Sequence, residues 1–100
     1  MHRVRITRLA QADLHDIQER GLAAFGVVAT RSFMEGFDQI FANLALYPLL
    51  GQIRPEYGRG VRGCPHPPYR VLYRFEADVI SIMAIVHASR RSHTVDDTKQ

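Results

Sequence analysis

The chain has 100 residues, with 46% apolar and 23% charged side chains and a formal net charge of +3. This balance indicates one globular domain and excludes a disordered chain, and no apolar run approaches the roughly 20 residues that span a bilayer. The N-terminus lacks a signal-peptide pattern and Cys64 is the one cysteine, so we expect a cytoplasmic protein.

The first elements are a strand and a short helix. Apolar and polar residues alternate over residues 3–7, which indicates a half-buried strand. Thr7 then fits a helix N-cap, because its hydroxyl can accept from an unpaired amide of the first turn. Helical spacing predicts a short helix over residues 8–20, ended by Gly21.

A second, longer helix follows. It begins between residues 22 and 27, where Gly26 marks a break or a kink, and it ends before Pro48 because the residue before a proline avoids helical geometry. Its apolar stripe has helical spacing and consists of Ala29, Phe33, Phe37, Ile40, Phe41 and Leu44. Gly36, inside the stripe, leaves room for close contact. Two helices joined by a short loop make an αα-hairpin.

The second half of the chain predicts three strands. Residues 51–68 are rich in glycine and proline and form a loop, with room for one short strand at residues 59–63. Residues 69–76 alternate and form a clear strand. After a tight turn, residues 79–86 are apolar at nearly every position, which places this strand in the middle of the sheet.

These elements predict an α+β fold with the order β-α-α-β-β-β. A helix hairpin packs on one face of a small, mainly antiparallel four-stranded sheet, with the first strand beside the last. The other face has no helix and carries arginines, so its uncovered surface fits a helix or added strand from another chain. We assign residues 1–91 to this domain and residues 92–100 to a polar C-terminal tail.

Arginines in the second half suggest a phosphate site. Lys99 is the one lysine among 13 basic residues, and arginine forks bind phosphate well. A cluster of arginines with a histidine could cleave RNA, and its members would be Arg62, Arg70, Arg74, His87 and Arg90. The alternative is that these arginines only protect a strand edge from aggregation.

Other chemical signals are weaker. The five histidines show no ligand spacing, so we expect no metal site and no cofactor. Cys64 lacks a visible base, so it is not expected to be a nucleophile. An aromatic stripe in the strand at residues 69–76 could stack nucleobases, but we favour a buried face; its members are Tyr69, Tyr73 and Phe75.

Five segments in this order resemble the ParE/RelE superfamily of toxins from bacterial type II toxin–antitoxin systems, on the ParE side. Residues 6–17 are similar to the opening strand and the Leu-Ala-x-x-Asp-Leu-x-x-Ile helix of the family. Residues 44–51 resemble its Leu-x-x-x-Pro-x-x-Gly helix end, and residues 60–62 its Gly-x-Arg strand. Residues 69–74 and 80–90 resemble its aromatic Tyr-Arg strand and its terminal strand with His and Arg.

The resemblance has departures, and those near the end of the chain weaken the RNA-cleavage alternative. Ala84 and Arg91 differ from common family residues, and the insert at residues 64–68 is unusual. RelE-type ribonucleases carry several basic residues, and often an aromatic residue, near the end of the chain. Here no lysine precedes Lys99 and no Tyr or Phe follows Phe75.

The resemblance implies a toxin that binds and inhibits DNA gyrase and arrests growth, without an enzymatic site. It implies neutralisation by a ParD-like antitoxin, contact with operator DNA only through that antitoxin, and no membrane or small-molecule substrate. The residues that we expect to bind the antitoxin, or else to lie in the core, are Leu9, Ile17, Phe25 and Phe33. Target contact is expected at His87, Arg90 and Arg91.

Two alternatives remain open at the level of sequence. A RelE-type, ribosome-dependent mRNA endoribonuclease would use Arg62, Arg74, His87 and Arg90, with His87 in proton transfer. A degenerate member would be held by its antitoxin and be toxic to nothing.

Overall fold

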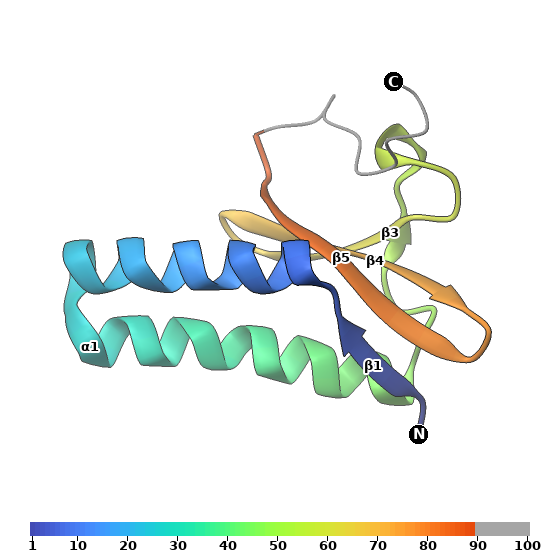
Figure 1. Cartoon of the computed structure of the whole chain (residues 1–100), viewed down its shortest axis with the longest axis horizontal. Helices are drawn as coiled ribbons and strands as arrows, with labels where there is room; N and C mark the ends of the chain where they lie inside the picture. The colour runs from blue at the N-terminus through green and yellow to red at the C-terminus, as the bar shows by residue number, and fades with distance from the viewer. Residues whose placement is uncertain (90–100) are drawn as a thin grey trace.

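Five strands and one long helical element make up the described part of the chain, residues 1–89 of a computed structural model (Figure 1). The sheet has the order β1-β5-β4-β3-β2; β1 runs parallel to β5 and the other neighbours are antiparallel. The bounds are β1 Arg3–Ile6, α1 Arg8–Leu46, β2 Gln52–Ile53, the 3₁₀-helix η1 Pro55–Tyr57, β3 Arg62–His66, β4 Tyr69–Glu76 and β5 Val79–His87. The α+β class is confirmed, and β2 makes the sheet five-stranded rather than four-stranded.

Element α1 is a hairpin of two helical segments that meet at Gly26 (Figure 1). Gly26 has φ +85°, a left-handed value that disfavours residues with a Cβ, so the chain reverses there. Thr7 is the N-cap, and its hydroxyl accepts from Ala10 N at 3.3 Å, as predicted. The predicted end at Gly21 is wrong: Gly21 is helical, and a Cβ there would lie 2.9 Å from Thr30 Oγ1, so it allows close approach of the two segments.

The predicted strand at residues 59–63 lies further along the chain, as β3. It includes Pro65, which was expected in a loop. Because β2 pairs only with Arg62 and Gly63, the rest of β3 is an edge of the sheet, where a proline is tolerated.

The main core lies between the α1 hairpin and the sheet. Its buried members are Ala10, Ile17, Phe37, Phe41, Leu44, Cys64, Val71, Tyr73, Ile80, Ile82 and Ile85. The aromatic stripe of β4 therefore belongs to the core, and Tyr69 packs with its ring centroid 6.0 Å from Phe33. Ala29 is exposed, against the predicted stripe, because the turn of the hairpin projects beyond the sheet and all of residues 22–29 are exposed (Figure 1).

The second face of the sheet carries a small core of its own. Tyr57, Val61 and Leu72 are fully buried there, with Val86 packed against them. The segment around η1 covers this part of the face, and η1 is only three residues long. We call this the helix-free face, because α1 packs on the opposite side. Among residues 1–89, no helix has the length and apolarity needed to cross a bilayer.

Candidate functional site

The turn of the α1 hairpin carries a cluster of exposed apolar side chains. Val28 is 84% exposed and Phe25 76% exposed, and the cluster, called here the tip patch, consists of Leu22, Phe25, Val27 and Val28. These side chains touch little of the core, because the hairpin overshoots the sheet. Grouped apolar side chains of this kind mark surfaces that bind another molecule.

A shallow depression of about 370 Å³ continues from the tip patch along the two segments of α1. Leu22 and Val27 belong to both, and Met34 adds a further apolar wall. Thr30 also lines it, and its Oγ1 is buried without a hydrogen-bond partner among the described residues. Charged side chains stand at its rim: Arg31, Glu35 and Asp38. An apolar floor with a charged rim suits the apolar face of an amphipathic helix.

The structure separates the residues predicted to bind an antitoxin. Leu9 and Phe25 are exposed, at 56% and 76%, and are free to meet a partner. Ile17 is buried in the main core, and Phe33 is half-buried against His66, with ring centroids 4.2 Å apart. Leu9 and Phe25 do not form one patch, since 16 residues of helix between them span about 24 Å.

Sequence reasoning missed the role of His66, which lies in a cradle made by α1. Its Nε2 donates to the carbonyl oxygen of Phe33 at 2.9 Å, since a carbonyl can only accept. Its ring stacks on Phe33 and meets Phe37 edge-on, at 4.6 Å. A Cβ at Gly36 would lie 2.3 Å from His66 Cε1, so the glycine makes room for the imidazole. The unusual insert thereby docks β3 onto α1.

Neither metal binding nor thiol chemistry finds support in this region. No group of three or more His, Cys, Asp or Glu within residues 1–89 could hold a metal ion. Cys64 is buried, and burial raises the pKa of its thiol, which disfavours the reactive thiolate.

The residues of the RelE-type alternative do not come together. Arg62 faces α1, where its Nη1 donates to the carbonyl oxygens of Gly51 at 2.8 Å and Leu49 at 3.3 Å. Arg74 lies on the helix-free face, and its Nε donates to the carbonyl oxygen of Arg59 at 2.9 Å. Arg62 pairs with Tyr73, the neighbour of Arg74, and alternation along the strand sends the two arginines to opposite faces.

His87 lies at the far end of β5 and is exposed. Its Nδ1 accepts from Ser89 N at 3.3 Å, and its ring meets Tyr69 edge-on. Arg74 pairs with Ser81, and six residues of strand between Ser81 and His87 span roughly 20 Å. Arg90 and Arg91, the other expected contacts, lie outside the described residues.

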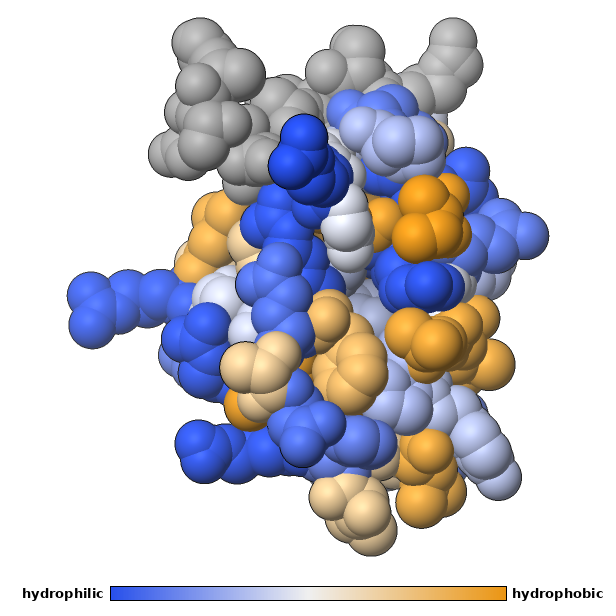
Figure 2. Space-filling view, turned by 90° about the vertical axis from the view of Figure 1, so that its right-hand side faces the viewer, coloured by the Kyte–Doolittle hydropathy of each residue, from blue (hydrophilic) through white to orange (hydrophobic). Residues whose placement is uncertain are grey.

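A second apolar surface, which was not predicted, lies around the end of α1. The exposed side chains, called here the post-helix patch, are Leu46, Tyr47, Leu49, Leu50 and Ile53. A run of leucines around Pro48 and Gly51 is the signal that could have found it. From the end of the molecule opposite the hairpin tip, Figure 2 shows groups of apolar side chains beside a broad hydrophilic band.

The fold and the exposed hairpin surface define a small α+β protein equipped to bind other proteins. Residues 4–92 match the family model described as the ParE toxin of the type II toxin–antitoxin system, parDE. The chain belongs to this family, and it is a ParE-like type II toxin. No curated protein matches the chain.

Two solved structures resemble the chain. A chain from the chromosomal ParDE toxin–antitoxin system of P. aeruginosa is similar with a TM-score of 0.76 and 24% identity, over 87% of this chain and 96% of that one. A chain of the toxin–antitoxin complex RelBE2 from Mycobacterium tuberculosis is similar with a TM-score of 0.55 and 30% identity, over 86% and 96%. The first likeness supports the ParE-like fold.

Proposed function

We propose that this toxin acts in the cytoplasm by binding DNA gyrase, and that a ParD-like antitoxin neutralises it by folding on α1. The observation that carries the proposal is the family match across residues 4–92, which covers both the hairpin and the sheet. Its activity is then that of a binding protein, which halts replication and arrests growth.

The surface of α1 supports an antitoxin partner. Both similar solved structures come from toxin–antitoxin systems, and one is a toxin–antitoxin complex. The tip patch and the depression beside it offer an apolar strip with a charged rim. A segment that folds on binding suits such a strip, because an amphipathic helix forms its apolar face only against a partner. Operator DNA would then be reached through the antitoxin.

The end of β5 is the proposed target contact. His87 is exposed there, beyond the part of β5 that β1 covers. We assign gyrase contact to His87 together with Arg90 and Arg91. The separation of His87 from Arg74 gives no support to a shared cleavage site, so the endoribonuclease remains the alternative to be tested.

A supercoiling assay tests the proposal. Purified toxin added to gyrase and relaxed plasmid should block supercoiling or raise the amount of cleaved DNA, and the product of the neighbouring antitoxin gene should reverse this. His87→Ala should lose this inhibition of gyrase. The control variant Arg20→Gln, on α1, should inhibit gyrase as the wild type does. Cleavage of mRNA on translating ribosomes, with gyrase unaffected, would establish the endoribonuclease instead. No effect in either assay would indicate a degenerate toxin.

A further inference from the structure

A row of two arginines and a serine crosses the helix-free face. Arg5 on β1 pairs with Ser81 on β5, and Ser81 pairs with Arg74 on β4. Arg5 Nη2 donates to Ser81 Oγ at 3.3 Å, and Arg74 is oriented by its bond to the Arg59 carbonyl. Because neighbouring strands lie about 4.8 Å apart, the backbones of the two arginines are about 10 Å apart.

A second pair of arginines lies on the same face, over Gly63. A Cβ at Gly63 would lie 3.2 Å from both Arg54 Cγ and Arg70 Cδ, so the stems of these arginines run side by side. Arg70 Nη1 donates to Tyr57 Oη at 3.1 Å. The lack of a side chain at Gly63 therefore lets two positive groups converge.

Arg54 is poorly satisfied by the described residues. Its Nη2 is 3.4 Å from Gln52 Oε1, and its Nη1 is 3.7 Å from a carboxylate oxygen of Glu56. Its Nε is buried and has no hydrogen-bond partner among residues 1–89. These distances are at or beyond the limit of a good hydrogen bond. The guanidinium of Arg54 could therefore form shorter, stronger hydrogen bonds with an anion that binds from solvent.

The spacing of the two pairs fits an extended anion. Arg70 and Arg74 are four residues apart on β4, which separates the pairs by about 13 Å. A DNA duplex of that length carries about eight phosphate charges, at one per ~1.7 Å of helix axis. Arg3 alternates onto this face with Arg5, Glu76 also lies on it, and Glu56 stands beside Arg54, so five arginines face two acids.

The helix-free face offers no described ring for stacking on bases. Among the described residues, the aromatic side chain on this face is that of Tyr57, and it is fully buried. Proteins that hold single strands rely on exposed aromatic rings, whereas contacts to a duplex backbone need only positive groups. We infer that the helix-free face, through Arg5, Arg54, Arg70 and Arg74, binds the phosphate backbone of double-stranded DNA without reading its sequence. This goes beyond gyrase binding, because the contact needs no gyrase.

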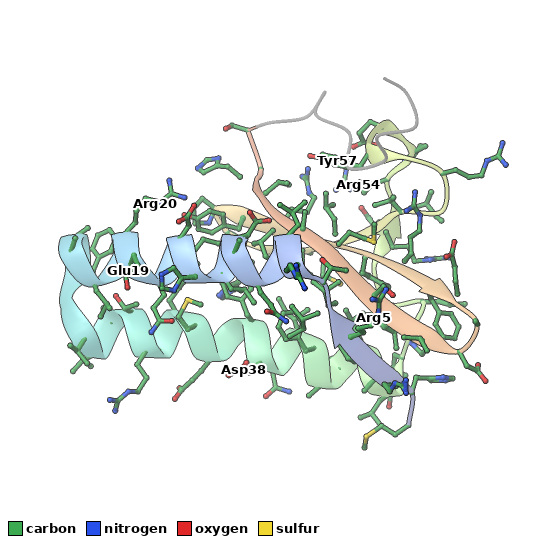
Figure 3. The ribbon with its side chains drawn as sticks, in the orientation of Figure 1. Arg5, Glu19, Arg20, Asp38, Arg54 and Tyr57 are labelled. Atoms are coloured by element: carbon green, nitrogen blue, oxygen red, sulfur yellow. The ribbon has the colours of Figure 1, made fainter. Side chains whose placement is uncertain are left out.

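Fluorescence anisotropy of a short labelled duplex of random sequence, titrated with the full-length toxin at several salt concentrations, tests the inference. The double variant Arg5→Gln/Arg54→Gln takes one arginine from each pair. The double variant Arg20→Gln/Arg31→Gln removes the same charge from exposed positions of α1; Figure 3 shows Arg20 on α1, far from Arg5 and Arg54. Circular dichroism and unfolding midpoints establish that all variants fold.

The expected result is a salt dependence that differs between the two variants. The slope of log Kd against log salt should fall by about 2 for Arg5→Gln/Arg54→Gln, at ~1 per phosphate contact, and should change little for the control. Equal effects of both variants, no duplex binding at low salt, or tighter binding to single-stranded DNA or a polyglutamate peptide would overturn the inference. Loss of gyrase inhibition with duplex binding intact would count against the proposed function alone.

Discussion

Gly36 has no side chain, and this leaves the space that the imidazole of His66 occupies. The imidazole occupies the space that a Cβ at residue 36 would need, and it is held there by the Phe33 carbonyl. Gly36 is within α1, where glycine costs about 1 kcal/mol relative to alanine. The cost is offset by the packing of His66 against Phe33 and Phe37.

Replacing Gly36 with alanine should therefore destabilise the protein, against the usual helix propensity. We expect Gly36→Ala to lower the free energy of unfolding by about 1–3 kcal/mol, because the new methyl group displaces His66. Urea denaturation followed by circular dichroism measures this. In a His66→Ala background the same change should raise stability, since the space is then empty. A gain in the wild-type background would contradict the cradle.

Asp13, on α1, accepts a hydrogen bond from the backbone of β5. Strand β1 ends opposite Ile82, and further along β5 the Ile85 amide donates to Asp13 Oδ2 at 2.9 Å. Burial raises the pKa of Asp13 above its ordinary value of 3.8, despite the opposing effect of this hydrogen bond. Burial thus removes part of the water that would stabilise the charged carboxylate of Asp13.

Two substitutions at Asp13 separate its charge from its hydrogen bond. Asp13→Asn keeps an acceptor for Ile85 and should leave stability at neutral pH unchanged or higher. Asp13→Ala leaves the Ile85 amide unpaired and should lower the free energy of unfolding by about 1–3 kcal/mol. Urea denaturation of both variants beside the wild type measures this, and equal losses would contradict the assigned bond.

The pH dependence of stability follows from the raised pKa of Asp13. The folded state binds this proton at a higher pH than the unfolded state does, so the wild type gains stability as pH falls from the raised pKa toward 3.8. Asp13→Asn lacks this gain. The difference in unfolding free energy between wild type and Asp13→Asn should shift toward the wild type as pH falls through that range, and the opposite trend would contradict the pKa direction.

At the scale of elements, the segment between α1 and β2 is held by side chains of the sheet. Tyr73 Oη donates to the Pro48 carbonyl at 2.7 Å and accepts from Gly51 N at 2.8 Å. Arg62 donates to the Gly51 carbonyl from the neighbouring strand. The sheet thus fixes the end of α1 and the position of the post-helix patch.

Tyr73→Phe should loosen this segment while keeping the ring in the core. Two buried polar groups lose their partner, so the free energy of unfolding should fall by about 1–3 kcal/mol. Hydrogen exchange of the Gly51 amide should also become faster. Tyr69→Phe is the matched control, because its hydroxyl has no hydrogen bond among the described residues. Equal losses from both changes would contradict the bracing role of Tyr73.

The elements differ in how well the sequence predicts them. Strands β1, β4 and β5 follow from alternation or from a continuous apolar run, because their burial is set by neighbours in the sheet. The end predicted at Gly21 was wrong because a helix interior uses glycine for close packing as well as for termination. Strand β2 has two residues, too short to show a period. The Arg62 side chain could not be assigned to a face, since the register of β3 depends on its pairing.

The candidate site was predicted only in part, for a related reason. Ile17 and Phe25 both belong to apolar helical patterns, yet one is buried and the other exposed. Their difference depends on where the sheet ends beneath α1, and the spacing of residues on a helix carries no information about that. Only the folded molecule shows which apolar residues remain for a partner.

At the scale of the whole molecule, the hairpin extends beyond the sheet, so the tip patch lies away from the main core (Figure 1). Side chains of the tip patch make few core contacts, so they can change without loss of the fold. The post-helix patch exposes a similar number of large apolar side chains, and it lies at the opposite end of the second helical segment of α1. It therefore provides a matched comparison for the proposed antitoxin surface.

We expect Phe25→Ala/Val28→Ala to weaken antitoxin binding by tenfold or more, at about 1–2 kcal/mol for each well-packed contact residue. Each of the two exposed substitutions should change the free energy of unfolding by no more than about 0.5 kcal/mol. Isothermal titration with the product of the neighbouring antitoxin gene measures binding, with Leu49→Ala/Leu50→Ala as control. The reverse ranking would place the antitoxin on the post-helix patch instead.

Strand β5 is an inner strand of the sheet, and it is the last strand of the described chain. Strand β5 lies between β1 and β4, and its parallel pairing with β1 joins Arg3 to Val79. During translation, the first 78 residues consequently emerge without the strand that unites them. A nascent or prematurely terminated chain without β5 should therefore remain unfolded, because the core lacks Ile80, Ile82 and Ile85.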